Sequence, residues 1–289
     1  MAEHSIQSIL PGAIATLANV SAWEDLKIML GSLEIYTPNP PPVYIFCCSK
    51  VMEALKTLEY NGTIYTRVVL NVYEQYNRAQ MERLPSKRGL SNLFHDFTQE
   101  KCDLMEWALD ASQEKDKGIL FCDADICWLG PVPSIPLGKT LALSPHMIHK
   151  RDEKRFGEFN AGFLWTNDST LPSVWRDLCK TSRFFEQAAL EDLSDQTLES
   201  EFYRFPETVN YGWWRMFQSP NGLDHQQSVW SCNTSGLTVK NQTVVCIHTH
   251  WITNDSVTSK FNTFIRRHLE ELRAKNSKTT KLLQSVLPP

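Results

Sequence analysis

Short apolar runs recur along the chain, and polar or amphipathic stretches separate them. Apolar runs of about five to eight residues between turn formers such as Gly, Pro, Asn and Asp are typical of β-strands. On this pattern we expect strands at residues 13–19, 43–47, 63–70, 118–122, 140–144, 160–166 and 243–247.

Amphipathic stretches with apolar residues at helical spacing lie between these runs. They predict helices after Ser21 through about Leu33, at 93–109, at roughly 171–190 and at about 257–273. Residues 71–92 lack a pattern and are expected to form a long loop. Because strands alternate with helices, the predicted fold class is α/β, with a mostly parallel sheet covered by helices on both faces.

Bulk composition narrows the class of protein further. A chain of 289 residues with 42% hydrophobic content can form one large domain. A net charge of -4 gives no sign of the basic surface that nucleic-acid binding needs, so no nucleic-acid partner is expected.

The sequence also bears on where the protein resides. No stretch approaches the roughly 20 apolar residues of a membrane span, and Met1–Gln7 does not resemble a signal peptide. We therefore expect a cytoplasmic protein whose eight cysteines are reduced and packed in the core, and we attribute its six N-x-S/T sequons to chance. The oligomeric state is not predicted.

The strand expected at 118–122 ends on two carboxylates, Asp123 and Asp125. At the carboxyl end of a parallel strand, such a pair can bind a hard divalent cation that also holds phosphate oxygens. The alternative is a strand-end turn in which the aspartates bond local backbone amides.

Lys101 lies on the apolar face of the helix that precedes this strand. A lysine there either extends its ammonium to solvent or meets an anion. An anion at the Asp123 edge of the sheet would be a natural partner.

His248 and His250 end the strand expected at 243–247 and point to the same side. A histidine at a strand end can complete a carboxylate metal site, although a lone histidine is more often structural. His248 is the favoured ligand of the two.

Taken in order along the chain, these features resemble a known group of enzymes. The set comprises Asp123-Ala-Asp125 after an apolar strand, Phe159-Asn-Ala-Gly-Phe163, an acid–Gln pair at Glu186-Gln187 and a late strand ending in His248. It is similar to the GT-A glycosyltransferases, which have a Rossmann-like fold, and among them to glycogenin-like and related nucleotide-diphospho-sugar transferases.

The resemblance implies a division of the chain and a reaction. It implies a single catalytic domain over 1–289, with a nucleotide-binding half at about 13–130, an acceptor half at about 131–275 and a tail at 276–289. The implied activity moves a hexose or pentose from a nucleotide diphosphate donor, expected to be a UDP-sugar, to a hydroxyl of a glycan or glycoprotein acceptor, with Mn²⁺ or Mg²⁺ as cofactor.

The resemblance also implies roles for individual residues. Ala15, Thr16 and Leu17 would line the uridine pocket, Lys101 would approach the diphosphate, and Asp123, Asp125 and His248, with Ala124 between the carboxylates, would form the metal site. Asn160, Ala161 and Gly162 would border the donor sugar. Glu186 and Gln187 would lie beside its reacting face, with Asp195-Gln196 as a rival placement. Lys260 would replace the phosphate-binding lysine of the family.

Two adjacent tryptophans, Trp213 and Trp214, could form a platform for an acceptor sugar, with His250 nearby. Packing in the core is the alternative for such a pair. The charged segment 146–158, just before Asn160, is expected to be a mobile loop that closes over the donor.

Two other functions share the aspartate pair. A metal-dependent nucleotidyltransferase or nucleotide-sugar hydrolase would also use it, but a nucleotidyltransferase should show a Gly-rich basic loop after the first strand, and residues 19–23 contain neither Gly nor a basic residue. A non-catalytic carbohydrate- or nucleotide-binding module is the third reading, and it does not need both aspartates.

Overall fold

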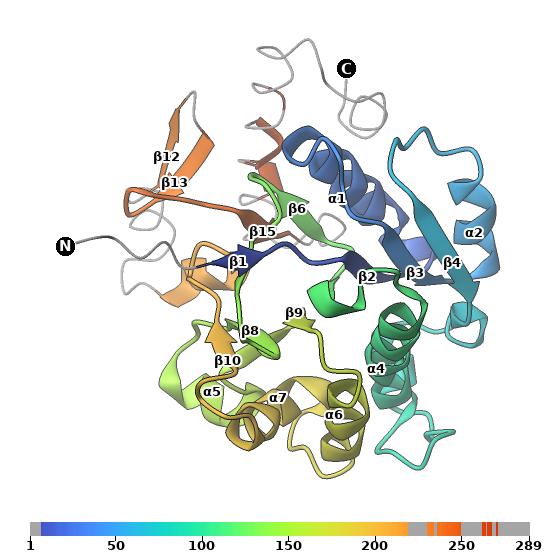
Figure 1. Ribbon diagram of the computed structural model, residues 1–289. Coiled ribbons are helices and arrows are strands. Elements are labelled where there is room, and N and C mark those ends of the chain that lie inside the picture. Colours follow the sequence, from blue (N-terminus) through green and yellow to red (C-terminus); the bar gives the residue numbers. More distant parts are fainter. Residues whose placement is uncertain are drawn as a thin grey trace.

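A mixed sheet of seven strands forms the centre of the molecule (Figure 1). The computed structural model describes residues 7–218, 230–233 and 236–249, together with 262, 263, 265–267 and 270. From one edge to the other the strands are β10 (Phe202–Arg204), β8 (Leu141–Pro145), β9 (Phe159–Thr166), β5 (Ile119–Cys122), β2 (Ala13–Ala18), β3 (Val43–Cys47) and β4 (Ile64–Val68).

The sheet is mostly parallel, as predicted, but one strand is reversed. β9 runs antiparallel to both of its neighbours, β5 and β8, whereas the other pairs are parallel. As a result the N-terminal end of β9 meets the C-terminal ends of β5 and β8. Residues from the start of one strand and the ends of others therefore lie at a single edge of the sheet.

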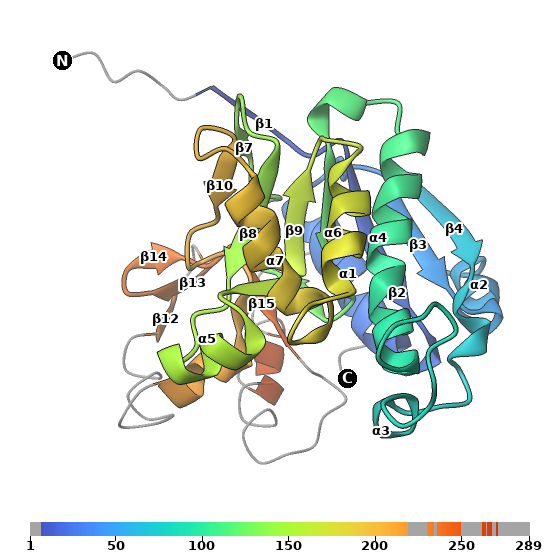
Figure 2. The same cartoon turned by 90° about the horizontal axis from the view of Figure 1, so that it is seen from below.

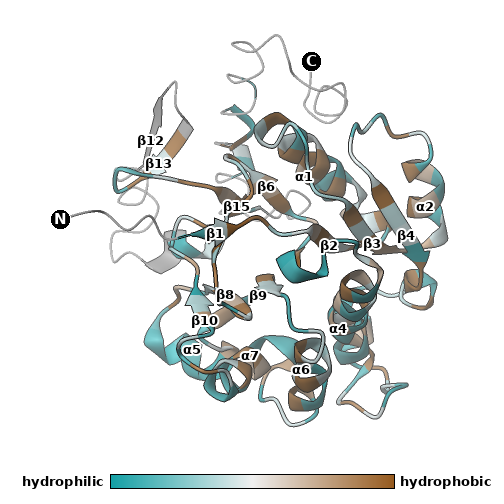
Figure 3. Cartoon of the chain, in the orientation of Figure 1, coloured by the Kyte–Doolittle hydropathy of each residue, from teal (hydrophilic) through white to brown (hydrophobic). Residues whose placement is uncertain are grey.

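Helices cover both faces of this sheet (Figures 1 and 2). Helix α1 (Trp23–Tyr36) lies on one face, and α4 (Leu93–Ala111), α6 (Leu171–Cys179) and α7 (Phe185–Gln196) lie on the other. The apolar stripe predicted on α4 is buried, including Leu104, Met105 and Ala108, and the side chain of Asn92 caps the helix by accepting from the amide of His95. In Figure 3 the hydrophobic residues concentrate on the strands and inner helix faces.

A small second sheet lies against one end of the large one. It consists of β11 (Tyr211–Gly212), β15 (Cys246–His248) and β6 (Ile126–Trp128), in that order. Strand β6 follows β5 almost at once, so the chain passes directly from the large sheet into the small one. The turn between them, residues 123–125, is thereby held at both ends. Two further sheets are peripheral. One pairs β1 (Ser8–Ile9) with β7 (Ile135–Pro136), and the other consists of β12 (Trp230–Asn233), β13 (Gly236–Val239) and β14 (Gln242–Thr243), in that order.

Several elements differ from the sequence prediction. The segment expected to be a loop at 71–92 contains the short helix α3 (Arg78–Met81), and the charged segment contains α5 (Lys150–Phe156). The helices expected at 171–190 are present as α6 and α7, but α7 continues to Gln196. The strand expected at 243–247 is interrupted, because β14 ends at Thr243 and β15 begins at Cys246. Helix α2 (Ser49–Leu55) and strands β6 and β10 were missed because each is too short to show a period.

Two expectations about the whole chain can be compared with the structure. The seven cysteines whose side chains are described are buried and unpaired, as expected of core thiols. Among the described helices, none combines the length and apolar character that crossing a bilayer requires. The helix expected at 257–273 falls largely outside the described residues.

Candidate active site

The turn after β5 carries the two aspartates, and β15 delivers the histidine to them. The amide of Ile126 donates to the carbonyl of Asp123, closing the turn. Strands β6 and β15 are antiparallel and pair Ile126 with His248. His248 therefore lies opposite the turn, with Nε2 2.9 Å from Oδ1 of Asp125 and 3.9 Å from Oδ2 of Asp123.

These three residues form a cluster that could hold a metal ion. One ligand atom from each of Asp123, Asp125 and His248 lies within 4.8 Å of the others. Two carboxylates and one imidazole are ligands that Mn²⁺ and Mg²⁺ accept. The donor set therefore fits a hard divalent cation, and Asp123 and His248 face a cavity where further ligands could bind.

Asn210 orients the histidine from behind. It is fully buried, and its Oδ1 lies 3.1 Å from Nδ1 of His248, which directs Nε2 toward the aspartates. Its Nδ2 donates to Oδ1 of Asn160 at 3.0 Å and to Oγ of Ser144 at 3.2 Å. Asn210 has a φ of 57°, in the left-handed region that asparagine tolerates better than most residues. Asn210 thus links His248 of the candidate metal site to Asn160.

Gly162 makes room for the cluster. A Cβ at this position would lie 2.5 Å from Oδ2 of Asp123 and 2.6 Å from Cε1 of His248. The pairing of β8 with β9 is irregular here, because Leu143 pairs with Leu164 and the next residue pairs with Asn160. The strand pairing is therefore bulged next to Gly162, and the irregularity coincides with the close approach of Gly162 to the carboxylate of Asp123.

Lys101 is buried between two acidic groups. Its Nζ lies 3.2 Å from Oδ1 of Asp123 and 3.0 Å from Oε1 of Glu186, and it donates to the carbonyl of Ala161 at 3.1 Å. Only 7% of the residue is exposed, so the interpretation that its ammonium extends to solvent is wrong. Burial alone would lower the pKa of Lys101, but the two carboxylates outweigh that effect and raise it, so the lysine is charged.

Burial and charge also shift the protonation of the cluster itself. Removal from bulk water raises the pKa of Asp123, although Lys101 and His248 oppose the shift. Burial lowers the pKa of His248, but Asp125 and then Asp123 outweigh it, and the net change is upward. In the absence of a cation these groups therefore share protons, which a bound cation would displace.

The acid–glutamine pair lies in the first turn of α7. The carbonyl of Glu186 accepts from the indole of Trp175, and Nε2 of Gln187 donates to the carbonyl of Phe156 at 2.7 Å. Phe185, immediately before the pair, has a φ of 42°, a strained value for an aromatic residue. The rival residue Asp195 is exposed at the opposite end of the same helix.

A cavity of about 650 Å³ connects these features. Ten of the predicted site residues line it: Lys101, Asp123, Asn160, Ala161, Gly162, Glu186, Gln187, Trp213, Trp214 and His248. Asp195 does not line it. His250 and Lys260 lie outside the described residues.

The two tryptophans lie on the wall of this cavity, each only partly buried, rather than wholly inside the core. Nε1 of Trp214 donates to the carbonyl of His146 at 2.7 Å, and its ring meets that of His248 edge to face at 5.1 Å. Trp213 packs against Trp214 with ring centroids 6.1 Å apart. The pair thus offers aromatic surface next to the metal cluster.

The predicted base-binding residues are less exposed. Ala15, Thr16 and Leu17 are buried in β2, and Ala15 pairs with Phe121 of β5. Leu17 therefore comes level with Asp123 at the same edge of the sheet. The hydroxyl oxygen of Thr16 is buried and has no hydrogen-bond partner among the described residues.

Sequence reasoning missed three residues that support the site: Asn210, Ser144 and Arg215. Arg215 is 4% exposed and donates through Nη2 to the carbonyls of Pro145 and Asn210, and burial lowers its pKa to about 10. The only signal for Asn210 was its place in the polar stretch before the tryptophans. Its partners lie 38 to 66 residues away, so no local pattern marks it.

The fold is the GT-A type expected from the sequence, with a mixed sheet between helical layers and an Asp-x-Asp turn at its edge. Two structures of the glycosyltransferase GlyE from Streptococcus pneumoniae TIGR4 are similar to this chain with a TM-score of 0.51 and 14% sequence identity. The alignments cover 94% and 96% of this chain and 66% and 65% of GlyE, so the chain spans about two thirds of that protein.

Mouse xyloside xylosyltransferase 1 in its apo form aligns over 86% of this chain and 99% of its own, with a TM-score of 0.48 and 13% identity. Neither protein-family models nor curated proteins give a match to the sequence. Similarity at this level of identity shows the fold alone.

Proposed function

We propose that the protein is a metal-dependent glycosyltransferase that moves a sugar from a nucleotide diphosphate donor to a hydroxyl of an acceptor. The observation that supports this most directly is that Asp123, Asp125 and His248 cluster together while Asp123 also pairs with Lys101, and that Asp123, His248 and Lys101 line one cavity. The fold adds support, because GlyE is described as a glycosyltransferase.

In this proposal Asp123, Asp125 and His248 hold Mn²⁺ or Mg²⁺. When bound, the cation neutralises charge that grows on the diphosphate as the glycosidic bond breaks. Asn210 and Gly162 act on the same site without binding the donor. Asn210 fixes the tautomer and direction of His248, and Gly162 leaves the space that a larger residue would fill.

Lys101 supplies a second positive charge at the same edge. Its ammonium already lies among oxygen atoms of Asp123, Glu186 and Ala161. A diphosphate bound beside Asp123 would come within reach of this ammonium, and charge-assisted contacts to phosphate are among the strongest hydrogen bonds in proteins. A buried, permanently charged lysine is suited to this role because it donates without changing its protonation.

The sugar of the donor would lie between the start of β9 and the start of α7. Asn160 and Gln187 meet there, with Nδ2 of Asn160 3.5 Å from Oε1 of Gln187. Because this contact is long, Nδ2 of Asn160 and Oε1 of Gln187 are the two amide atoms proposed to bond sugar hydroxyls, while Oδ1 of Asn160 and Nε2 of Gln187 already bond other protein groups. Glu186, held by Lys101, lies beside the same space and is our candidate for the residue near the reacting carbon.

The donor base would bind at the ends of β2 and β3. The hydroxyl of Thr16 is a buried polar group with no hydrogen-bond partner in the described part of the chain, and a ligand could supply one. A UDP-sugar is the expected donor, and both hexoses and pentoses are candidates for its sugar.

A screen of donor hydrolysis tests the proposal. Slow release of nucleoside diphosphate from UDP- and GDP-linked sugars, with Mn²⁺ or Mg²⁺ and without acceptor, identifies the donor before the acceptor is known. We expect turnover that requires the cation and that Asp125→Asn abolishes. Asp192→Asn, which removes an exposed carboxylate from α7, is the matched control and should be active.

Other outcomes identify the alternatives. Asp195→Asn should be active if Glu186-Gln187 is the pair at the sugar. Release of a sugar phosphate and a nucleoside monophosphate would indicate a nucleotide-sugar hydrolase that cuts the diphosphate. Calorimetric binding of nucleotide sugars with no turnover across a broad panel of donors and acceptors would indicate a binding module.

A further inference from the structure

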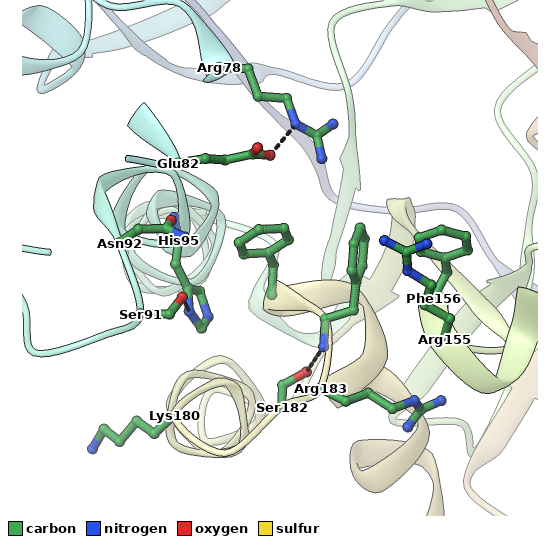
Figure 4. Close-up of a pocket in the computed structure, with 12 residues that line it drawn as sticks. Arg78, Glu82, Ser91, Asn92, His95, Arg155, Phe156, Lys180, Ser182 and Arg183 are labelled. Carbon is green, nitrogen blue, oxygen red and sulfur yellow. Dashed lines mark hydrogen bonds and ion pairs between the residues drawn. The ribbon is translucent and has the colours of Figure 1, made fainter. Parts of the chain in front are cut away.

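A second cavity adjoins the candidate active site and has a distinct chemical character. It measures about 660 Å³ and shares Arg78, Phe156 and Phe184 with the first cavity. Figure 4 shows it between the α3 segment, the start of α4, the end of α5 and the loop from α6 to α7. Since the two cavities have walls in common, a ligand longer than one sugar could extend from one into the other.

Positive charge dominates this second cavity. Its lining includes four cationic side chains, Arg78, Arg155, Lys180 and Arg183, and a single carboxylate, Glu82. The chain as a whole carries a net charge of -4, so the grouping of four cationic side chains at one cavity contrasts with the negative charge of the whole protein. We refer to these four residues and the space between them as the basic subsite.

The four cations are not equally engaged with protein carboxylates. Arg78 pairs with Glu82 at 2.8 Å, Lys180 with Asp177 at 2.7 Å, and Arg183 with Glu191. Arg155 pairs with no carboxylate within the part of the chain that the structure describes, and its guanidinium lies over the ring of Phe156, 4.8 Å from the centroid. Arg155 is therefore the cation most available to a ligand.

The remaining lining suits a saccharide. Phe156 and Phe184 meet edge to face at 4.8 Å, and Phe184 meets Phe185 at 5.0 Å, so aromatic faces and edges line the wall. Ser91, Asn92 and Ser182 add hydroxyl and amide groups. Aromatic rings with interspersed polar groups are typical of small-molecule sites that bind ligands both by packing and by oriented hydrogen bonds. The strained Phe185 precedes Glu186 directly, which ties this wall to the proposed reaction centre.

We propose that the basic subsite binds an anionic group of the acceptor, so that the acceptor is an acidic saccharide whose reacting hydroxyl lies in the first cavity. This inference rests on the proposed glycosyltransferase activity and deepens it. The negative group would be a carboxylate, as in a uronic acid, or a sulfate or phosphate ester. The donor's own diphosphate is assigned to the edge of the sheet near Asp123 and Lys101, so it does not account for the charge of the subsite.

Paired acceptors test this inference. The probes are saccharides that differ only by a charged group, such as a glucoside and the matching glucuronide, and a neutral glycoside with its sulfated and phosphorylated forms. The donor is the nucleotide sugar identified by the hydrolysis screen, supplied at a saturating concentration. Under these conditions we expect the KM of the wild-type protein to be lower for the acidic member of a pair by roughly tenfold, as one charge-assisted contact predicts. Comparing the glucuronide with the sulfated and phosphorylated glycosides shows whether the subsite prefers a carboxylate or a sulfate or phosphate ester.

Charge variants locate the effect. Arg155→Gln should raise the KM for the acidic acceptor about three- to tenfold and leave the KM for the neutral one unchanged, because an exposed charge contributes less than a buried one. Arg151 lies one turn earlier on α5 and lines neither cavity. The control Arg151→Gln removes the same charge there and should behave like the wild type. Raising the ionic strength should reduce the preference of the wild type and not that of Arg155→Gln.

Different results would overturn different claims. If the wild type hydrolyses no nucleotide sugar, the proposed function fails. If it hydrolyses donor but shows equal KM values within each pair, or if Arg151→Gln and Arg155→Gln behave alike, the basic subsite has no role in acceptor binding while the activity stands. If acidic peptides lower donor hydrolysis and receive the sugar while acidic saccharides do neither, the saccharide assignment is wrong.

Discussion

At the scale of single residues, the two aspartates of the candidate site have unequal structural roles. Asp123 faces Lys101 at 3.2 Å, whereas Asp125 faces His248 at 2.9 Å. As residues at the end of a strand, both would be expected from the sequence to be replaceable without harm to the fold. The structure changes that expectation, because Asp123 also balances a buried ammonium.

We expect Asp123→Ala and Asp125→Ala both to reduce metal-dependent turnover by about 100-fold or more, since each removes a ligand of the proposed cation. We further expect Asp123→Ala to destabilise the protein by about 1–3 kcal/mol, because Glu186 is then the only charged partner of Lys101 among the described residues. Denaturant unfolding of the metal-free proteins measures the difference. Equal stability of the two variants would show that Lys101 does not depend on Asp123.

Gly162 provides a second test at this scale. Gly162→Ala should abolish cation binding, because the added methyl would lie about 2.5 Å from an oxygen of Asp123 and displace it. Gly130→Ala is the control, since its nearest neighbour, Cα of Val245, would be at an ordinary 3.5 Å. Titration with Mn²⁺, followed by electron paramagnetic resonance, measures binding without relying on activity. Undiminished Mn²⁺ affinity in Gly162→Ala would contradict the assigned geometry.

His146 should make the folded state sensitive to acid. Burial lowers its pKa from 6.5 to about 4, so the unfolded chain binds a proton over this range and the folded protein does not. Its contribution to stability is therefore present above pH 6.5 and is lost as the pH falls toward 4, by roughly 3 kcal/mol in all. The free energy of unfolding of wild type minus that of His146→Gln, measured from pH 7.5 to 4, should shrink accordingly. A constant difference would refute the assignment.

At the scale of elements, α5 is the segment most suited to respond to ligand. It is hydrophilic along its length (Figure 3), and residues with positive φ, Met147 and Gly157, flank it. It is also tethered to α7, because Gln187 donates to the carbonyl of Phe156, and to the loop before α7, because Arg183 donates to the carbonyl of Lys154 at 2.9 Å. Ligand binding at Gln187 would therefore be transmitted directly to this helix.

We expect amide hydrogen exchange in residues 146–158 to slow when UDP and Mn²⁺ are bound together. The reason is that Ile148, Asp152 and Phe156 line the cavity and would contact the donor. Asp125→Asn, with the same ligands, is the control and should show no change. Identical exchange with and without ligand in the wild type would mean that α5 does not close over the site.

The elements that the sequence predicted correctly are those with a repeated pattern. The strands β2, β3, β4, β5, β8 and β9 and the helices α1 and α4 were all found close to their observed bounds. Helix α5 was missed because its charged residues show no apolar stripe, and the reversal of β9 leaves no mark in an apolar run that is buried on both faces. Periodicity reports which residues are buried and does not report strand direction.

The same distinction applies to the candidate site. Asp123, Asp125 and His248 could be proposed because each ends an apolar run, and the structure brings them together. The partners of Lys101 and the position of Asn210 could not be predicted, since they depend on contacts between residues 22 to 85 positions apart. The local sequence pattern indicates the proposed metal ligands, whereas the groups that orient them are determined by tertiary packing.

At the scale of the whole molecule, cation binding should stabilise the fold. The proposed ligands come from the turn between β5 of the large sheet and β6 of the small sheet, and from β15 of the small sheet, so a cation would tie that turn to β15. At about 100 times the dissociation constant, a ligand that binds only the folded state adds roughly 2.7 kcal/mol. We expect Mn²⁺ to raise the melting temperature of the wild type by several degrees and EDTA to reverse it. In Asp125→Ala the shift should vanish; a shift that persists there would assign the effect to another site.

The division between the two sheets also has a consequence for how the protein is made. All seven strands of the large sheet lie between Ala13 and Arg204, whereas Asn210 and His248 come afterwards. During translation the ribosome therefore completes every strand of the large sheet before it synthesises His248, the last residue of the candidate metal site. A nascent chain can therefore form its central sheet while the proposed cation site is still incomplete, and any capacity to bind a cation would be among the last properties that it gains.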